Sequence, residues 1–452
     1  MGFRSDFMWG AATSAYQIDG AVTGTGKGLQ IWDVFSKQPG RVYEGHTGDI
    51  ACDHYHRFRE DVKIMKELGL KAYRFSVDWS RVLPEGTGRV NEEGITFYQE
   101  LIDALLESEI EPFITLYHWE LPYELHKRGG WLNPEIAEWF GAYAALVADR
   151  FSDRVKNFFT LNEPQCFVGL GYLSGIHAPG LKCNYRDTFE IAHNVLRAHG
   201  RAVQELRAHA HQPIIIGYAP TSGACYPETE KQEDIEAARQ MYFALPEIGE
   251  RWTWNVTWWS DPVFFGSYPE EGLARYEQYL PKITDEDMKL ISQPIDIYGQ
   301  NIYNGHCVRM GADGKPEIAE RKAGFPKTSI GWPVTPECLQ WAPRFLYERY
   351  KTPIYITENG MACHDVVSLD GKVHDPNRID FLTRYLSELK KAADVADIRG
   401  YFQWSLLDNY EWAAGYSERF GLVYVDFETQ QRILKDSAFW YRDLIRENGA
   451  GL

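Results

Sequence analysis

Two glutamates stand where their carboxylates could do chemistry. Glu163 comes after the apolar run 155–161 and precedes a proline, and Glu358 comes after the apolar run 353–356, just before Asn-Gly. A carboxylate at the end of a strand, beside Pro or Gly, tends to point into a cleft. Two such carboxylates can cleave a glycosidic bond, because one donates a proton while the other attacks or activates water.

The two carboxyl groups would need different protonation states. In a retaining mechanism they lie about 5–5.5 Å apart, and one of them attacks the anomeric carbon. Arg74 and Tyr303, each at the end of a predicted strand, could keep Glu358 ionised by supplying a cation and a hydroxyl donor. Ionised Glu358 would then raise the pKa of Glu163 by like-charge repulsion. The alternative is that both glutamates are structural ion-pair residues.

Aromatic and polar residues gather near the C-terminus, in the segment 401–412. Trp404 ends a strand-like run and could form a platform under a sugar ring. Glu411 and the indole N–H of Trp412 could bond sugar hydroxyls. Core packing is the alternative for each tryptophan, but their clustering with a loop glutamate favours a sugar pocket. His118 also ends an apolar run, where it suits a hydroxyl partner.

These residues depend on strands that alternate with helices. Amphipathic, helix-like runs cover 53–68, 92–108, 134–151, 186–209 and 377–393. The strand candidates are near Met8–Ala12, Ala72–Val77, Pro112–Tyr117, Val155–Leu161, Pro213–Tyr218, Ile295–Gln300, Ile354–Thr357 and Ile398–Trp404. This alternation predicts α/β architecture, a single (β/α)8 TIM barrel domain over residues 1–452, with functional residues at the carboxyl ends of the strands.

The connections after the strands should form the walls of a deep pocket. The longest are expected at 166–185, 219–262, 303–335 and 405–430, with an exposed hairpin around 311–316. An open doubly wound sheet is the alternative fold, but no Gly-x-Gly-x-x-Gly follows an early strand. We interpret the glycine-rich stretch 24–28 as a flexible loop.

Other reaction classes lack their signatures. His54 and His56 are two residues apart, on different faces of a helix, so packing and capping by Asp53 are favoured over metal binding. Asn91 is expected to cap the helix at 92–108. No Gly-x-Ser-x-Gly elbow is present, and no histidine base can be assigned to Cys166. We therefore expect no metal and no cofactor.

The bulk composition excludes several kinds of partner. The formal net charge of −17 argues against nucleic acid or an anionic membrane as a partner. No apolar stretch reaches the roughly 18 to 20 residues of a membrane span, and no signal peptide is evident. The seven cysteines are scattered, without a Cys-x-x-Cys pair. That pattern predicts a reducing, cytoplasmic compartment and leaves the oligomeric state open.

Several motifs, in order, resemble glycoside hydrolase family 1, the β-glucosidase type, over almost the whole chain. The matching stretches are 7–17 (Phe-Met-Trp-Gly-Ala-Ala-Thr-Ser-Ala-Tyr-Gln), 73–76, 116–119, 160–164, 356–360 and 401–426. The resemblance implies a retaining exo-β-glycosidase acting on small β-glycosides or short oligosaccharides. Glucose is the favoured non-reducing sugar, with galactose and fucose as further options.

The resemblance also implies a role for each matching residue. Glu358 matches the nucleophile and Glu163 the acid/base, while Arg74 and Tyr303 match groups that support the nucleophile. Trp332 resembles the wall of the leaving-group site. The remaining substrate-binding matches are Gln17, His118, Trp119, Asn162, Asn301, Tyr303, Trp404, Glu411, Trp412 and Phe420.

Some positions depart from the family pattern. Asp19, Asp78 and Glu120 replace the residues usual there, but none matches a sugar-contacting position. The flank of the leaving-group site, including Gln165, Cys166 and the loop 219–226, is the least transferable part.

Three kinds of related protein remain as alternatives. In a phospho-β-glycosidase, Glu411 and Trp412 would lie where the sugar phosphate needs cations, so a carboxylate there would repel the substrate. A myrosinase-like enzyme resembles this pattern with Gln at the position of Glu163. A catalytically inactive sugar-binding domain of the same fold should have lost one of the two glutamates, and both are present.

Overall fold

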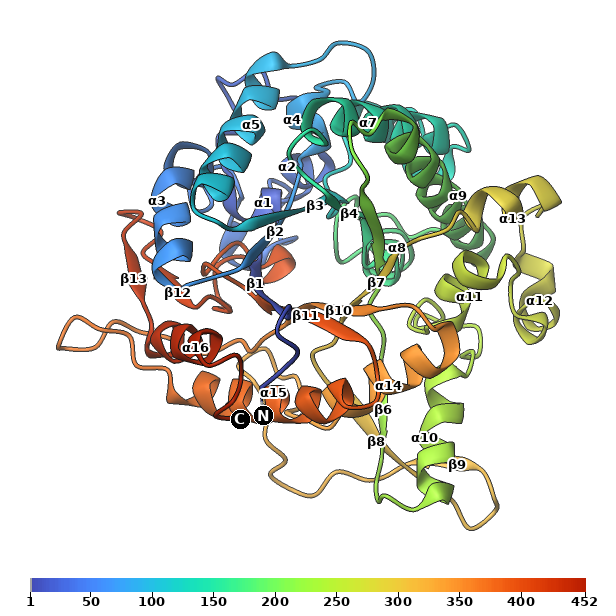
Figure 1. The fold of residues 1–452 in the computed structure, drawn as a ribbon. Coiled ribbons are helices and arrows are strands. Elements are labelled where there is room, and N and C mark those ends of the chain that lie inside the picture. Colours follow the sequence, from blue (N-terminus) through green and yellow to red (C-terminus); the bar gives the residue numbers. More distant parts are fainter. Residues whose placement is uncertain (1) are drawn as a thin grey trace.

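The computed structural model describes residues 2–452, in which parallel strands close into a barrel (Figure 1). The order around the barrel is β1-β11-β10-β7-β5-β4-β3-β2. The barrel strands are β1 (Met8–Ala12), β2 (Ala72–Ser76), β3 (Glu111–Tyr117), β4 (Asn157–Asn162), β5 (Ile215–Ala219), β7 (Ile297–Asn301), β10 (Ile354–Asn359) and β11 (Ile398–Trp404). Each predicted strand is present, so the (β/α)8 prediction is confirmed and the open sheet is excluded.

The strands that carry the glutamates have different bounds from those predicted. β4 begins at Asn157, because the Val155 amide donates to Phe151 O and still belongs to the end of the preceding helix. β10 continues to Asn359, because Glu358 O accepts from the Ile302 amide. Glu358 therefore lies within its strand, and not beyond it.

An outer layer of helices surrounds the barrel (Figure 1). The five predicted helices are all present within two residues of their expected bounds. In α5, Ile95, Tyr98, Ile102 and Leu105 are buried, as their spacing predicts. The main outer helices are α3 (His54–Glu67), α5 (Glu92–Glu107), α7 (Ile136–Phe151), α9 (Tyr185–His209), α14 (Cys338–Tyr350), α15 (Pro376–Ala393) and α16 (Asp436–Arg446).

Both predicted helix caps are wrong in detail. Asn91 precedes α5, but its side-chain amide donates to the carbonyls of Thr25 and Arg81 instead of accepting from the first turn of the helix. Asp53 precedes α3 with φ of 51° and pairs with His56. In both cases the side chain of the expected cap bonds another partner instead of the backbone amides of the first helical turn.

The predicted wall segments contain secondary structure of their own. The segment after β5 was expected to be loop, but it holds β6 (Ala224–Pro227), α10 (Gln232–Phe243) and α11 (Thr257–Phe265), followed by α12 (Glu270–Tyr276) and α13 (Asp285–Ile291). The expected hairpin is formed by β8 (Gly305–Met310) and β9 (Pro316–Ile318), and β8 also pairs with β6. After β11 the chain forms the short pair β12 (Val423–Val425) and β13 (Arg432–Leu434).

Short helices complete the pocket end of the molecule. They are α1 (Ala15–Ile18), α2 (Ile31–Phe35), α4 (Trp79–Val82), α6 (Tyr123–Lys127) and α8 (Pro164–Val168). The glycine-rich stretch 24–28 lies in the connection between α1 and α2. Lys27 within it is buried against Asp33, at 2.8 Å, and Asp78, at 3.5 Å. The Lys27 ammonium group therefore forms ion pairs in the protein interior.

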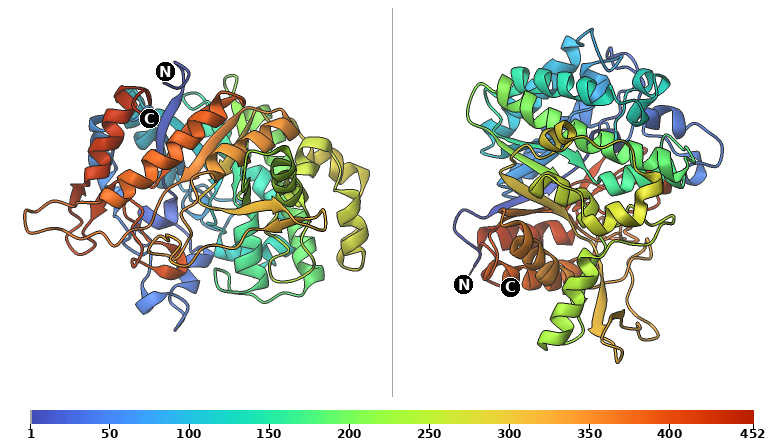
Figure 2. Two further views of the ribbon diagram at one scale, coloured as in Figure 1. Left: turned by 90° about the horizontal axis from the view of Figure 1, so that it is seen from below. Right: turned by 90° about the vertical axis from the view of Figure 1, so that its right-hand side faces the viewer.

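Side chains fill the interior of the barrel. Phe113, Phe159 and Phe402 are almost fully buried, and the Phe113 ring lies 5.0 Å from Phe402 and 6.4 Å from Phe159. Figure 2 shows the two termini side by side in both views. There the Trp9 indole N–H donates to Asn448 Oδ1 at 2.9 Å, which ties β1 to the end of the chain.

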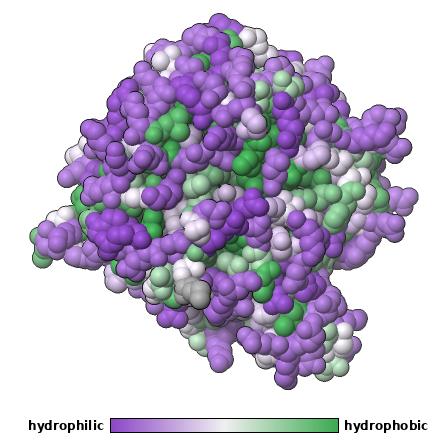
Figure 3. All heavy atoms as spheres, viewed as in Figure 1, coloured by the Kyte–Doolittle hydropathy of each residue, from purple (hydrophilic) through white to green (hydrophobic). Residues whose placement is uncertain are grey.

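Polar side chains cover most of the face shown in Figure 3, with apolar residues in scattered groups between them. This follows from the amphipathic outer helices, whose apolar sides face the strands. Across residues 2–452, no helix combines the length and the apolar character needed to cross a membrane.

Candidate active site

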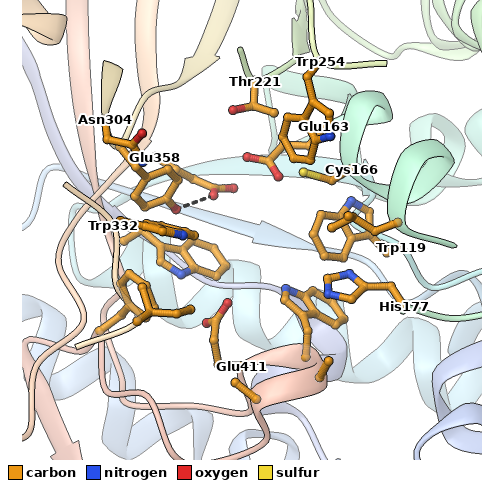
Figure 4. Close-up of a pocket in the computed structure, with 18 of the residues that line it drawn as sticks. Trp119, Glu163, Cys166, His177, Thr221, Trp254, Asn304, Trp332, Glu358 and Glu411 are labelled. Carbon is orange, nitrogen blue, oxygen red and sulfur yellow. Dashed lines mark hydrogen bonds between the residues drawn. The ribbon is translucent and has the colours of Figure 1, made fainter. Parts of the chain in front are cut away.

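A cavity of about 450 Å³ lies at the carboxyl ends of the barrel strands (Figure 4). Ten of the predicted site residues line it: His118, Trp119, Glu163, Tyr303, Trp332, Glu358, Trp404, Glu411, Trp412 and Phe420. The other predicted residues, Gln17, Arg74, Asn162 and Asn301, are fully buried and hydrogen-bonded to residues of this wall. The structure thus brings the whole predicted set together.

The Glu358 carboxylate is held by one cation and one hydroxyl. Arg74 Nη1 donates to Glu358 Oε1 at 2.7 Å, and Tyr303 Oη donates to Oε2 at 2.8 Å. Arg74 is itself fully buried, and its other donors bond Asn162 Oδ1 and Thr115 Oγ1. Burial raises the pKa of Glu358, and Arg74 and Tyr303 oppose that rise by favouring the ionised form. Both predicted contacts are therefore present.

Glu163 lies in a different environment within the same cavity. It sits between β4 and α8 with φ of 47°, followed by Pro164 at the start of the helix. Its Oε1 accepts from Asn301 Nδ2 at 2.9 Å. Burial, and then repulsion by Glu358, raises the pKa of Glu163 to about 7. The direction agrees with our expectation, but burial is the larger cause, and like-charge repulsion comes second.

Asn162 connects the surroundings of both glutamates. Its Oδ1 accepts from Arg74 and, at 3.0 Å, from Asn301 Nδ2, while its Nδ2 lies 3.1 Å from His118 Nε2. The indole N–H of Trp119 donates to Asn162 O at 3.0 Å. That N–H is therefore not available to a ligand, and Trp119 contributes its ring to the cavity wall. The ring packs 4.4 Å from the Trp412 ring.

His118 is held neutral beside the cavity. Burial, and then the nearby Arg74 cation, lowers its pKa well below the usual value. Its backbone amide donates to Glu120 Oε2 at 2.8 Å, and Ser76 Oγ donates to the other oxygen of Glu120. Glu120, one of the departures from the family pattern, thus supports the turn that carries His118.

Gln17 and the 409–411 segment meet at the far wall. Gln17 lies in α1, beyond the end of β1, and its Nε2 donates to Asn409 Oδ1, Tyr410 O and Glu411 Oε2 at 2.9–3.3 Å. Burial, together with Glu358 and Glu163, raises the pKa of Glu411 to about 8. The uncharged form of Glu411 can both donate and accept hydrogen bonds.

Aromatic rings form the other boundaries of the cavity. Trp404 stacks on His118, with centroids 5.5 Å apart and planes 19° apart. The half-buried Trp332 packs 5.1 Å from Tyr303 and 5.9 Å from Phe420. Flat apolar faces beside hydrogen-bonding groups suit the two faces and the rim of a sugar ring.

The structure also adds wall residues beyond the predicted substrate-binding set, and four of them, Cys166, Thr221, Ser222 and Gly223, lie in the expected flank of the leaving-group site. They are Leu170, His177, Thr221, Ser222, Gly223, Trp254, Asn304, Ile330, Ala413 and Ala414, with Cys166 beside Glu163 (Figure 4). All of them lie in the segments that we expected to form the walls. Nothing in their local spacing distinguishes them, because the long connections fold back in ways that no helix or strand period encodes. Gln165 lies behind this wall and accepts from the Thr221 amide.

The two histidines considered for metal binding have separate partners. His54 Nδ1 bonds Asp61 at 2.7 Å in the interior, whereas exposed His56 bonds Asp53. Among residues 2–452, no three His, Cys, Asp or Glu side chains are grouped as a metal ion would require.

Comparison with known proteins identifies the family. The family model "Glycosyl hydrolase family 1" matches residues 1–450. This chain belongs to glycosyl hydrolase family 1. The family that the sequence motifs predicted is therefore confirmed.

Individual family 1 members are similar over their full length. Beta-glucosidase A of Thermotoga maritima is 47% identical over 99% of this chain and 98% of its own. Beta-glucosidase A of Acetivibrio thermocellus is 44% identical over 99% of each chain. The structure of the Thermotoga maritima β-glucosidase in complex with glucoimidazole superposes with a TM-score of 0.89, covering 99% of each chain.

Proposed function

We propose that this chain is a retaining exo-β-glucosidase that removes terminal β-glucosyl residues from small glycosides or short oligosaccharides. The observation that carries the proposal is the pair of carboxyl groups in one cavity. Glu358 is held by Arg74 and Tyr303, and Glu163 has a pKa of about 7. Two carboxyl groups with divergent environments are the equipment of a glycosidase.

In the first step, Glu358 attacks the anomeric carbon while Glu163 gives its proton to the glycosidic oxygen. The bond between that carbon and the leaving oxygen breaks, and a glycosyl ester forms on Glu358. The ester carries no charge, so the repulsion that raises the pKa of Glu163 falls. Glu163 can then take a proton from water as the water oxygen attacks the same carbon and releases Glu358.

The proton on Glu163 gives the first step a definite pH dependence. The group must be protonated to act, so kcat/KM should decline as pH rises through about 7. The neutral, buried His118 is poorly suited to replace it, because burial and Arg74 both disfavour its protonated form. We therefore assign His118 to a hydroxyl of the sugar.

The glucose preference is supported by the names of relatives, whereas the cavity does not distinguish the two orientations of the sugar's 4-hydroxyl. Two relatives, at 47% and 44% identity, are each named Beta-glucosidase A. A Bifidobacterium breve relative at 38% identity is named a bifunctional β-D-glucosidase/β-D-fucosidase, so fucosides belong in the same substrate panel. Gln17 and Glu411 together could accept either orientation of a 4-hydroxyl, which keeps galactosides in the panel as well.

A phosphorylated sugar fits the cavity poorly. Glu411 lines the far wall, and Glu418 is close enough to raise its pKa further. Glu418 itself accepts from Ser329 Oγ. A 6-phosphate placed here would lie beside acidic groups, and none of the described residues that line the cavity is a lysine or an arginine. The phospho-β-glycosidase alternative therefore predicts cations where this chain has acids.

Incubation with 4-nitrophenyl β-D-glucoside distinguishes an enzyme from an inactive sugar-binding domain. We expect release of nitrophenol, with β-glucose as the first sugar in proton NMR spectra. Glu358→Gln is the matched control, because it keeps the size of the side chain and removes the nucleophile. If the wild type released nitrophenol no faster than the control, the inactive sugar-binding domain would be the remaining hypothesis. If α-glucose appeared first, a retaining mechanism would be excluded.

A further inference from the structure

Three acidic and three basic side chains from the described residues form a buried network behind the segment 405–421. Four of them have side chains with 0% exposure, and the other two have 3% and 17%. The opposite charges are equal in number, so the network is neutral as a whole. Its members are Asp365, Asp375, Arg378, Asp408, Arg419 and Lys435.

Asp408 lies at the junction of this network with the segment. Its Oδ1 accepts from Lys435 Nζ at 2.6 Å and from the Gly421 amide at 2.9 Å, and its Oδ2 accepts from Arg419 Nη1 at 2.7 Å. Lys435 also bonds Asp365 Oδ2 at 2.5 Å. One carboxylate thus joins both ends of the segment to the base of α16.

The segment held in this way, together with Trp404 just before it, carries the sugar-facing side of the cavity. We call Trp404, Glu411, Trp412 and Phe420 the glycone wall. The chain immediately after Asp408 supplies the Asn409, Tyr410 and Glu411 oxygens that accept from Gln17. On the other side, the Ser405 amide donates to Phe420 O at 3.1 Å.

The packing around Asp408 leaves little freedom for this segment. A Cβ added at Gly421 would lie 2.1 Å from the Asp408 amide nitrogen. The backbone at Gly421 is therefore in direct contact with the backbone at Asp408. A buried charge deprived of its partner is strongly unfavourable. The positions of Lys435 and Arg419 therefore restrict Asp408, and through it Phe420 and Glu411.

We propose that Asp408 is a positioning residue for sugar binding: from outside the cavity, its three bonds to Lys435, Arg419 and the Gly421 amide set the spacing of the glycone wall. Asp408 does not line the cavity. The inference rests on the proposed function, because it assigns the glycone wall to sugar recognition.

The test is the Asp408→Asn variant, which keeps the size of the side chain and removes its charge. Binding of deoxynojirimycin, a glucose-shaped iminosugar, is measured by titration calorimetry, and KM is measured with 4-nitrophenyl β-D-glucoside. We expect Kd and KM to rise roughly 10- to 100-fold, since small misplacements of binding groups have effects of this size. The calorimetric Kd requires no turnover. It therefore tests the positioning role of Asp408 independently of the proposed reaction.

The matched control is Asp261→Asn. Asp261 is also buried and bonds Arg349 Nη2 at 2.6 Å and Tyr350 Oη at 2.8 Å, but its partners lie away from the cavity. This variant should unfold at a lower temperature and keep the wild-type Kd. A folded Asp408→Asn protein with the wild-type Kd and KM would overturn the proposal, as would an equal loss of binding in the control.

A second variant serves if Asp408→Asn does not fold. Arg419→Met removes the more exposed partner of Asp408 and leaves the Lys435 bond in place. A rise of about threefold or more in Kd supports the proposal, and an unchanged Kd overturns it. Failure of the wild type both to bind the iminosugar and to hydrolyse the glucoside would instead refute the proposed function.

Discussion

At the scale of single residues, the environment of each glutamate suits a different chemical task. Arg74 and Tyr303 both contact Glu358, whereas Glu163 Oε1 accepts from the neutral amide of Asn301. A cation hydrogen-bonded to a carboxylate oxygen favours the ionised form of the carboxyl group, and burial without such a partner favours the protonated form. The two residues are of the same type, so their neighbours make the difference.

Rescue by azide tests this division of roles. Glu358→Gly should abolish turnover of an activated aryl β-glucoside, and added azide should restore it while producing the α-glycosyl azide. Glu163→Ala should be restored with the β-glycosyl azide, because the nucleophile is still present and azide replaces water in the second step. Proton NMR of the products identifies the anomers. The opposite pairing of anomer and variant would reverse the assignment.

At the scale of elements, the two strands that carry the glutamates lose their regular register just before the active residues. The pairing of β10 with β7 shifts between Ile356 and Glu358, and that of β4 with β5 shifts between Phe159 and Asn162. Irregular pairing of this kind re-aims side chains and is common beside active sites. The interior below must be tightly packed to hold these ends in place.

The packing of that interior can be tested at Gly217 in β5. A Cβ there would lie 2.4 Å from the Phe159 ring and 2.8 Å from Ile297, inside the barrel. We expect Gly217→Ala to lower the free energy of unfolding by about 1–3 kcal/mol through overpacking. Gly249→Ala is the control, because nothing lies within 4 Å of its added Cβ. Chemical denaturation measures both, and equal stabilities would show that the interior has room to adjust.

At the scale of the whole molecule, the two ends of the chain close the same part of the barrel. Asn448 accepts from the Trp9 indole and donates through Nδ2 to Phe3 O at 2.8 Å. The Tyr441 hydroxyl in α16 donates to Gly10 O in β1 at 2.8 Å. We therefore propose that residues 1–452 act as one catalytic domain, in which the C-terminal helix supports the first strand.

Asn448→Ala tests this closure. The change leaves the Trp9 N–H and the Phe3 carbonyl without their partner, which should cost about 1–3 kcal/mol of stability. The thermal midpoint should fall, by about 1 °C for each kcal/mol in a chain of this size, while KM stays at the wild-type value. Calorimetry should still show one transition. Two separate transitions would contradict the single domain, and Asn377→Ala, at an exposed position, is the control.

The sequence by itself determined the barrel class and many of the residues at the carboxyl ends of its strands. Strand and helix periods are local, so eight strands and five major helices could be located within a few residues. Glu163, Glu358 and Trp404 were found because each follows an apolar run. The family motifs supplied Asn301 and Phe420, which local pattern alone would have left unassigned.

Only the tertiary structure decided which groups face one another. The register of barrel closure brings Arg74 to Glu358, and folding of the last segment brings Glu411 to Gln17, over separations that no local period encodes. It also placed Trp254 and His177 in the wall, replaced the cap expected from Asn91, and made burial the main cause of the raised pKa of Glu163. Burial and side-chain contact depend on the packing of distant segments, so they emerge only when the chain is folded.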